Sequence, residues 1–279
     1  MYKILKKQSL ADNIFLYEIK APEIAQKAEA GQFVIIRIHE KGERIPLTIA
    51  DYSREEKTIT IIFQVVGKTT EELAKLDAEE EILDLVGPLG VPSEVGKYGT
   101  VVCVGGGVGI APIYPIARAL RKTGNKVISV IGARNSNLLF WREKMQSVSD
   151  ELIIVTDDGS EGKKGFVTDA LKEVIKVEKI AKVWAVGPMV MMRAVAEATR
   201  PFKIPTIVSL NPIMVDGTGM CGACRVSLGT ETKFACVDGP EFDAHLVDFD
   251  LALKRLSFFT NEESRARQEG NCGGECGCH

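Results

Sequence analysis

The residues between Asp216 and Cys236 have the types and spacing of metal ligands. Cys221 and Cys224 stand two residues apart, and Cys236 follows further along the chain. Six of the seven cysteines lie after residue 220, and in a reducing compartment such clustering favours metal ligation over disulfides. Three thiolates do not complete a site with four ligands, so a fourth donor is required.

Asp216 and the cysteines of the tail 271–279 are the two candidates for that donor. Plant-type [2Fe-2S] sites use C-x4-C-x2-C and a distant fourth cysteine. Asp216 stands where the first cysteine of that pattern would be, with Cys236 as the distant ligand. Two alternatives remain open at this point, because Asp-Gly is a common turn and C-x2-C pairs also bind structural zinc.

Two glycine-rich turns predict dinucleotide binding, because each ends a predicted strand and opens a predicted helix. Glycine lets the backbone approach a pyrophosphate, and a helix N-terminus supplies free N–H groups and partial positive charge. The spacing is not that of G-x-G-x-x-G, so either turn alone is also compatible with a tight connection. The candidate residues are Gly105, Gly106, Gly107, Gly109, Ile110, Ala111, Gly187, Pro188 and Met189.

Charged residues follow the next two predicted strands. An acidic residue at a strand end can bind the ribose hydroxyls of NAD, whereas NADP calls for cations at its additional phosphate. Asp157 and Asp158 favour NAD(H), while Arg134, Lys163 and Lys164 keep NADP open. We take Asp157 and Arg134 as nucleotide-binding candidates, with a solvated loop as the alternative.

The predicted elements divide the chain into three parts, giving a β barrel plus α/β fold. Residues 1–97 read as short alternating strands with one helix over 69–76, which is typical of an antiparallel barrel. Residues 98–210 alternate buried strands with amphipathic helices, including one over 137–147, and predict a parallel sheet whose carboxyl edge binds ligands. Residues 211–279 form a small cysteine-rich segment with a helix over 243–256.

Composition excludes several functional classes. The formal net charge of -3 provides no basic surface for nucleic acid. No segment has the roughly 18 uninterrupted apolar residues of a membrane span, and the first residues do not form a signal peptide. We therefore expect a cytoplasmic protein that binds neither nucleic acid nor membrane.

The barrel followed by two glycine turns resembles the ferredoxin reductase superfamily over roughly the first 210 residues. The resemblance implies an FAD-binding barrel in which Pro46, Leu47 and Thr48 contact the flavin, with the Thr48 hydroxyl near flavin N5 in a catalytic role. The family arginine position is occupied by Ile45, and Arg44 is one residue too early, which on a strand means the opposite face. Further flavin contacts are implied for Phe63, Gln64, Gly67, Thr69 and Thr70.

The cysteine segment resembles that of the electron-transfer subunits of dihydroorotate dehydrogenases, which carry FAD and a [2Fe-2S] cluster but have cysteine in place of Asp216. RIPLTIADY and the Asp216 substitution are more similar, over essentially the whole chain, to the small-subunit family of electron-bifurcating NADH-dependent ferredoxin:NADP+ oxidoreductases. That family implies the ligand set Asp216, Cys221, Cys224 and Cys236, and leaves no assigned role for Cys272, Cys276, Cys278 and His279.

These resemblances imply a redox subunit containing FAD, a [2Fe-2S] cluster and a site for NAD(H). It would exchange hydride with NAD(H) and single electrons with a larger flavoprotein subunit that carries FAD and [4Fe-4S] clusters and handles NADPH and ferredoxin. An alternative is the electron-transfer subunit of an NAD-dependent dihydroorotate dehydrogenase. A second is a non-catalytic adapter with a degenerate flavin site and a zinc-bound tail, for which Ile45 is the best support.

Overall fold

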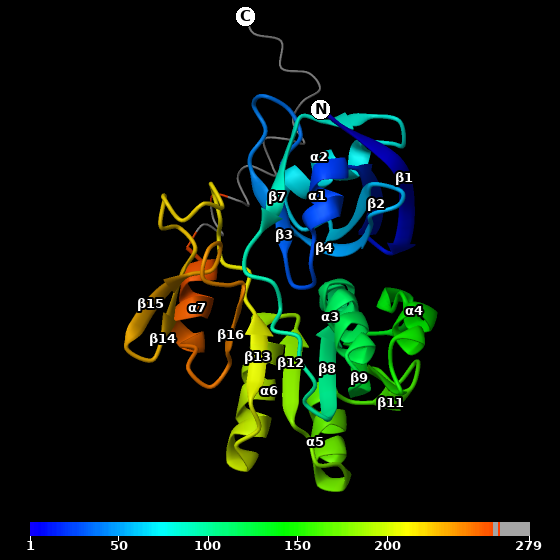
Figure 1. Cartoon of the computed structure of the whole chain (residues 1–279), viewed down its shortest axis with the longest axis vertical. Helices are drawn as coiled ribbons and strands as arrows, with labels where there is room; N and C mark the ends of the chain where they lie inside the picture. The colour runs from blue at the N-terminus through cyan, green and yellow to red at the C-terminus, as the bar shows by residue number, and fades with distance from the viewer. Residues whose placement is uncertain (259–261, 263–279) are drawn as a thin grey trace, which may run out of the picture.

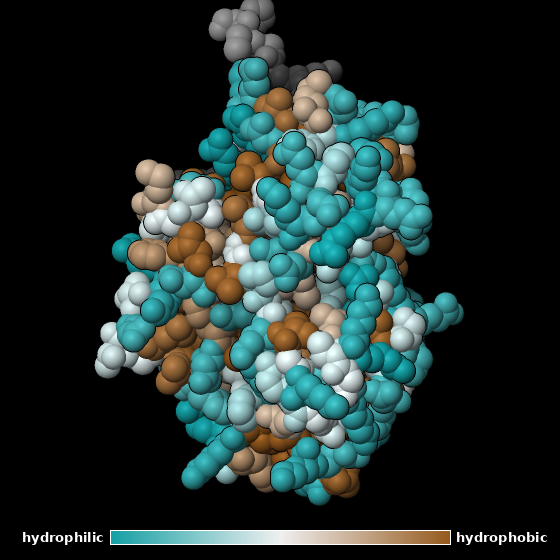
Figure 2. Space-filling view, in the orientation of Figure 1, coloured by the Kyte–Doolittle hydropathy of each residue, from teal (hydrophilic) through white to brown (hydrophobic). Residues whose placement is uncertain are grey.

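The computed structural model describes residues 1–258 and 262, and these form three connected parts (Figure 1). The barrel lies at one end, the nucleotide domain at the other, and a smaller hairpin unit packs beside both. Hydrophilic side chains cover most of the face in Figure 2, with apolar ones in scattered patches. Within the described residues, no helix has both the length and the apolar character that a membrane crossing requires.

The first part is a nearly closed antiparallel barrel, which confirms the sequence prediction. Its strand order is β6-β1-β2-β5-β4-β3-β7. Isoleucine-rich strands with alternating burial place one face of each strand in a common core. The strands are β1 (Tyr2–Ala11), β2 (Ile14–Lys20), β3 (Phe33–Arg37), β4 (Ile45–Ser53), β5 (Thr58–Gln64), β6 (Glu81–Ile82) and β7 (Asp84–Leu89).

The barrel part contains two helices, so the prediction of a single helix was wrong. The missed helix, α1 (Pro22–Lys27), has only six residues and begins with a proline at its first turn, too short for a helical period to stand out. The expected helix is α2 (Lys68–Lys75). Thr70 lies inside its first turn, where the hydroxyl accepts the amides of Val66 and Gly67 at 3.0 Å.

The second part is a seven-stranded sheet in the order β11-β10-β9-β8-β12-β13-β16, parallel except for β16. Helices cover it, as the strand-helix alternation predicted. The strands are β8 (Thr100–Gly106), β9 (Lys126–Ala133), β10 (Glu151–Thr156), β11 (Lys163–Lys164), β12 (Lys182–Val186), β13 (Thr206–Ser209) and β16 (Glu241–Asp243). The helices are α3 (Ile110–Lys122), α4 (Arg142–Ser147), α5 (Val167–Val177) and α6 (Met189–Thr199).

One of these helices is much shorter than predicted. The sequence indicated a helix over 137–147, but α4 spans only Arg142–Ser147 and a short 3-10 turn, η2 (Ser136–Leu138), precedes it. Trp141 lies between them with φ of 55°, a left-handed conformation that an α-helix does not contain. Two further 3-10 turns are η1 (Gly107–Gly109) and η3 (Arg200–Phe202).

The third part contains the hairpin β14 (Arg225–Leu228) and β15 (Glu231–Phe234) and the helix α7 (Phe249–Leu256). The helix predicted over 243–256 begins only at Phe249, because the Asp248 side chain accepts the Leu251 amide at 2.9 Å and caps it. Between hairpin and helix, β16 pairs with β13 and extends the sheet of the nucleotide domain. Residues 241–243, beyond the predicted end of the second part at residue 210, are therefore built into its sheet.

Candidate functional site

The two glycine turns lie side by side at the carboxyl edge of the sheet. Val186 at the end of β12 is the ladder partner of Gly105 at the end of β8. A methyl group on Gly109 would lie 2.1 Å from the Val186 carbonyl oxygen, and one on Gly187 would lie 2.9 Å from the Gly106 carbonyl oxygen. These glycines are required because the backbones of the two turns are in contact.

Only part of the first turn faces open space. Gly107 has φ of +55° and no atom within 4 Å of where a side chain would begin. The side chains of Ile110 and Ala111, at the start of α3, are buried in the core. A nucleotide can therefore meet these residues only through the backbone, and the amides at the start of this 13-residue helix are suited to a pyrophosphate.

Arg134 and Asp157 lie on adjacent strand ends. Thr156 of β10 is the ladder partner of Ala133 of β9, and the Asp157 amide donates to the Ala133 carbonyl at 3.2 Å. Both side chains are exposed, and within the described residues neither forms a side-chain hydrogen bond or ion pair. They remain available for a ligand at this edge.

The Asp158 side chain stabilises its own loop instead of facing a ligand. Its carboxylate accepts the Ser160 hydroxyl at 2.6 Å and the Ser160 amide at 2.9 Å, and these two bonds lower the pKa of Asp158. Lys163 is likewise engaged, because it pairs with Glu173 at 2.6 Å. Asp158 and Lys163 are therefore engaged in the protein itself, whereas Asp157, Arg134 and the exposed Lys164 are available to a nucleotide.

The expected flavin residues Pro46, Leu47 and Thr48 lie on β4, partly buried and paired with β3. Ile45 and Leu47 pack against the barrel core, so strand alternation leaves Pro46 and Thr48 on the other side. Ile45 thus fills a core-facing position. Arg44 is exposed, immediately before the strand.

The second expected flavin element is only partly arranged as predicted. The Phe63 ring is 2% exposed and packs between Phe15 and Tyr17, with centroids 5.9 and 5.2 Å away, so it cannot lie against a flavin. The Thr69 hydroxyl donates to Glu43 at 3.0 Å, and the Thr70 hydroxyl caps α2. Gln64 is exposed and Gly67 borders open space, which leaves backbone amides at the start of α2 as donors.

Asp216 is bound into the cysteine loop. Its carboxylate accepts the Thr218 amide and the Cys221 amide, both at 2.9 Å, and these bonds hold the pKa of Asp216 below its usual value. Gly217, Gly219 and Gly222 all have positive φ, so the loop follows a course that other residues rarely adopt. The Asp-Gly pair is a turn, as the alternative interpretation held, but its carboxylate is directed at the cysteine loop.

Cys224 and Cys236 lie together, with their sulfur atoms 3.2 Å apart. Both side chains are buried, whereas Cys221 is exposed. Burial and the neighbouring Cys224 thiol raise the pKa of Cys236 to about 12, so this thiol stays protonated at neutral pH unless a metal displaces the proton. The arrangement provides two adjoining sulfur donors and, at the exposed side of the loop, a third with a carboxylate.

The four expected ligands are not all gathered. Within residues 1–258 and 262, no three His, Cys, Asp or Glu side chains lie close enough together to hold a metal ion. The donor chemistry nevertheless fits an iron-sulfur cluster, because thiolates are its usual ligands and a carboxylate oxygen also binds iron. Cys272, Cys276, Cys278 and His279 lie outside the described residues.

The cysteine loop packs against the barrel near the flavin strand. A side chain on Gly217 would lie 2.5 Å from Ile35 and 2.9 Å from Leu89, both barrel residues. Ile35 is the ladder partner of Pro46, and its neighbour Phe33 is the partner of Thr48. One strand, β3, therefore separates the cysteine loop from the expected flavin contacts.

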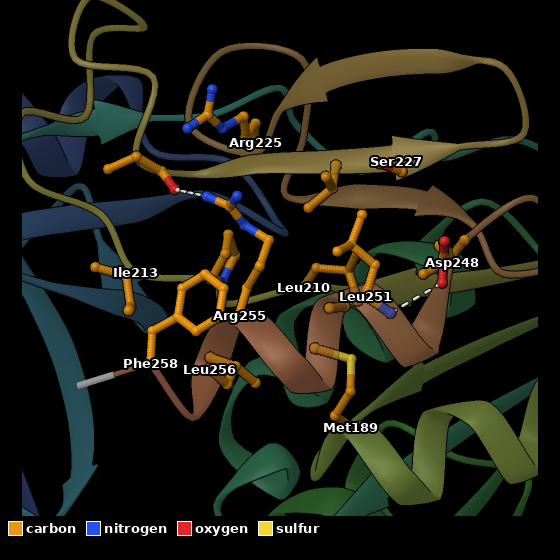
Figure 3. Close-up of a pocket in the computed structure, with 15 residues that line it drawn as sticks. Met189, Leu210, Ile213, Arg225, Ser227, Asp248, Leu251, Arg255, Leu256 and Phe258 are labelled. Atoms are coloured by element: carbon orange, nitrogen blue, oxygen red, sulfur yellow. Dashed lines mark hydrogen bonds between the residues drawn. The ribbon is translucent and has the colours of Figure 1, made fainter. Parts of the chain in front are cut away.

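A cavity of about 270 Å³ lies between α7, the hairpin and the start of α6. Arg255 reaches across it and donates to the Ala223 carbonyl at 3.1 Å, which fixes the backbone beside Cys224 (Figure 3). Met189 points into this cavity, so its side chain packs toward the third part of the molecule. Its predicted contribution to nucleotide binding is thus limited to the backbone.

Sequence reasoning gave no sign of Glu241, a carboxyl group of β16 where the nucleotide domain meets the barrel and the segment that connects them. Ser93 of the connecting segment donates to it at 2.5 Å, and a side chain on Gly31 of the barrel would lie 3.0 Å from it. Burial raises the pKa of Glu241, and the Ser93 hydroxyl offsets part of this increase. A single glutamate in a short strand leaves no recognisable pattern.

Comparisons with known proteins identify the parts in turn. Residues 103–197 match the oxidoreductase NAD-binding domain, and residues 211–248 match the iron-sulfur cluster binding domain of dihydroorotate dehydrogenase B. A "Dihydroorotate dehydrogenase B (NAD(+)), electron transfer subunit homolog" from Thermotoga maritima is 51% identical over 261 residues, covering 94% of this chain and 92% of the relative. The chain belongs to this electron transfer subunit family.

More distant members agree with that assignment. An electron transfer subunit from Fusobacterium nucleatum is 32% identical, over 86% of this chain and 95% of its own length. The matched domains show an iron-sulfur cluster and NAD(H) as cofactors. The ferredoxin reductase-like fold is consistent with the predicted FAD. The predicted fold class, oxidoreductase assignment and cofactors are confirmed.

Solved structures extend the comparison. One, described as giving insights into flavin-based electron bifurcation via the NADH-dependent reduced ferredoxin-NADP oxidoreductase, is 49% identical with a TM-score of 0.93, covering 97% of this chain and 98% of the other. Phthalate dioxygenase reductase, at 20% identity and a TM-score of 0.60, shares the fold over 81% of this chain and 85% of its own. The resemblance inferred from RIPLTIADY and Asp216 is confirmed.

Proposed function

We propose that this subunit exchanges hydride with NAD(H) and single electrons with a larger flavoprotein partner, as part of an electron-bifurcating ferredoxin:NADP+ transhydrogenase. The observation that carries the proposal is the Asp216 carboxylate, bound by the Cys221 amide at the position of the first cluster ligand. The near full-length similarity to the bifurcating oxidoreductase structure supports it. We place the subunit in the cytoplasm, as its cysteine usage favours.

The positions of the residues suggest which of them would bind the flavin and which would bind NAD(H). When bound, the flavin exchanges hydride with a nicotinamide and the cluster passes single electrons. Pro46 and Thr48 would orient the flavin from β4, and the Thr48 hydroxyl would donate a hydrogen bond near N5. The turn at Gly107 and the amides beginning α3 would hold the NAD(H) pyrophosphate, with Asp157 directed at the adenosine ribose.

Asp216, Cys221, Cys224 and Cys236 are the proposed cluster ligands. Cys224 and Cys236 supply the buried side of the site, and Asp216 with Cys221 supplies the exposed side. A carboxylate is a harder donor than a thiolate and favours ferric iron. We therefore expect the Asp216 ligand to lower the reduction potential relative to a site with four cysteines.

The exposed side of the loop is the proposed docking region for the larger subunit. Val215, Met220 and Val237 are 51%, 89% and 43% exposed around Cys221. Figure 2 shows weakly polar and apolar side chains over this loop, at the upper left of the view. An apolar surface beside a redox centre suits a partner that must approach closely. The proposed partner carries FAD and [4Fe-4S] clusters and handles NADPH and ferredoxin.

Co-expression with candidate partners, followed by anaerobic purification, tests the proposal. We expect a complex that reduces ferredoxin and NAD+ together when given NADPH. Asp216→Cys should retain a cluster with a raised potential and a changed ferredoxin to NADH ratio, while Glu231→Ala, in an exposed ion pair of the hairpin, should match the wild type. A complex that oxidises dihydroorotate and ignores NADPH would contradict the proposal.

The second candidate function is the electron transfer subunit of an NAD-dependent dihydroorotate dehydrogenase. The name of the Thermotoga maritima relative, at 51% identity, specifically favours it. Its partner would be a barrel dehydrogenase with FMN. Copurification of a subunit with [4Fe-4S] clusters would decide against it.

A further inference from the structure

The Asp51 carboxylate connects the flavin strand to the nucleotide domain. Its two oxygens lie 2.5 Å from Arg118 of α3 and 2.5 Å from Lys144 of α4. Figure 1 shows α3 and α4 directly beneath the barrel, so the contact crosses between the two parts. The Asp51 side chain is 17% exposed, which limits the screening of both ion pairs by water.

A β-bulge directs Asp51 toward these helices. Along β4, the register with β5 shifts between Ile49 and Asp51, which leaves Ala50 as the additional residue. A bulge changes the direction of the side chains that follow it. Thr48 stands three positions earlier, so the residue proposed to touch the flavin and the residue that contacts the nucleotide domain belong to one strand.

Aromatic rings fix the two cations. Lys144 lies 4.0 Å from the ring centroid of Trp141 and 4.6 Å from that of Tyr114. Arg118 lies 5.3 Å from the Tyr114 ring. Burial disfavours the charge on Arg118, but the Asp51 carboxylate outweighs this effect and raises the pKa of Arg118. Trp141 keeps its left-handed φ of 55° in this cluster, a conformation that its surroundings must enforce.

We propose that Asp51, acting through Arg118 and Lys144, is a positioning residue that sets the distance between flavin and nicotinamide. The inference rests on the hydride exchange proposed above. Because α3 begins directly after the Gly107–Gly109 turn, a movement of Arg118 displaces the proposed pyrophosphate site. Misplacement of reacting groups by about 1 Å can reduce a rate by about 100-fold.

Asp51→Asn tests the inference in the full chain with its cofactors. The variant leaves two neighbouring cations without a counter-charge. We expect the rate of flavin reduction at saturating NADH, followed by stopped flow, to fall about 10- to 100-fold. The half-saturating NADH concentration should change little, because the glycine turns are intact. Asp51→Glu should restore part of the rate.

Asp150→Asn is the matched control. Asp150 lies between α4 and β10, pairs with Arg121 of α3 at 3.6 Å and accepts the Val127 amide at 2.8 Å. Both contacts lie within the nucleotide domain, so the rate of Asp150→Asn should equal that of the wild type. A second readout needs no cofactor. In the apoprotein, amide hydrogen exchange in α3, α4 and β4 should accelerate in Asp51→Asn and not in Asp150→Asn.

A wild-type rate in Asp51→Asn, or an equal fall in Asp150→Asn, would overturn the inference. If Asp51→Asn fails to retain flavin, Lys144→Met decides, because it leaves the barrel unchanged, and a wild-type rate in that variant overturns the inference. If NADH does not reduce the wild-type flavin, the proposed hydride exchange fails. Amide hydrogen exchange in the apoprotein then tests the ion pairs of Asp51 by themselves. Unchanged protection of α3, α4 and β4 in Asp51→Asn would overturn the inference.

Discussion

The nucleotide turns and the cysteine loop are both glycine-rich, yet their glycines are required for different reasons. Gly109 and Gly187 adjoin backbone atoms of the opposite turn, so their site is fixed by main-chain packing. Gly217 adjoins the ends of the Ile35 and Leu89 side chains, and the donors of its loop are only partly gathered. The first site is shaped by contact between two backbones, whereas the second lies in a loop that packs against side chains of the barrel.

The largest expected effect is that of Gly109→Ala, because the new methyl would meet the Val186 carbonyl oxygen at 2.1 Å. We expect a loss of about 3 kcal/mol in the free energy of unfolding, with loss of NADH binding. Gly217→Ala should cost about 1–2 kcal/mol, mainly from its positive φ, since Ile35 can move. Denaturant unfolding and NADH titration measure both.

Gly107→Ala is the control for that comparison. It has a positive φ but no neighbour within 4 Å, so it isolates the conformational cost, about 1 kcal/mol. Its methyl would project where a pyrophosphate must approach, so NADH binding should weaken while the fold persists. Equal costs for Gly109→Ala and Gly217→Ala would contradict the distinction between the two sites.

Asp157→Ser sharpens the comparison at the nucleotide site. This variant lacks a carboxylate that would repel the additional phosphate of NADPH. The rate constant of flavin reduction by NADPH, divided by that for NADH, should therefore rise about tenfold. Asp158→Ser, at a residue engaged in its own turn, should change the ratio less. Stopped-flow reduction with each nucleotide measures the ratio, and an unchanged ratio in both variants would remove Asp157 from nucleotide selection.

The smallest expected effect concerns Glu241, at the contact between the nucleotide domain and the barrel. Because its pKa is raised in the folded protein, the folded state holds its proton to higher pH than the unfolded state. Glu241 therefore costs no stability at low pH and destabilises progressively as pH rises through the folded pKa. Glu241→Gln keeps an acceptor for Ser93 and should unfold at a higher temperature than wild type at pH 8, by a few degrees.

At pH 4 the unfolding temperatures of Glu241→Gln and the wild type should converge. Thermal unfolding across this pH range is the measurement. A constant difference at all pH values would show that the pKa of the carboxyl does not change on unfolding, and would remove Glu241 as a source of pH dependence at the contact between the nucleotide domain and the barrel.

The sequence predicted the elements whose signal is local. Alternating apolar residues indicated the barrel strands, and strand-glycine-helix units indicated the parallel sheet. Sequence-based prediction failed where tertiary packing determines the length of a helix or the strands of a sheet. The left-handed Trp141 shortens the helix expected over 137–147, and β16 joins the sheet from beyond residue 210. Neither has a signature in periodicity, because each depends on contacts with distant parts of the chain.

The candidate site divides in the same way. Spacing indicated the three cysteines and made Asp216 one of two candidates for the fourth donor, and the family resemblance then favoured Asp216. The structure places Cys224 beside Cys236. Phe63 was expected at the flavin but is buried in the barrel, since an aromatic residue at the end of a strand gives no indication of its face without the register. Asp51 was overlooked because its two partners are distant in the sequence.

The most direct test of the central claim is a combined flavin, metal and EPR analysis of the anaerobically purified wild type and Asp216→Ala. We predict FAD that NADH reduces, together with a dithionite-reducible [2Fe-2S] signal that is lost or altered in the variant. An identical cluster signal in the variant would contradict the Asp216 ligand. Zinc without flavin in the wild type would contradict the redox function itself.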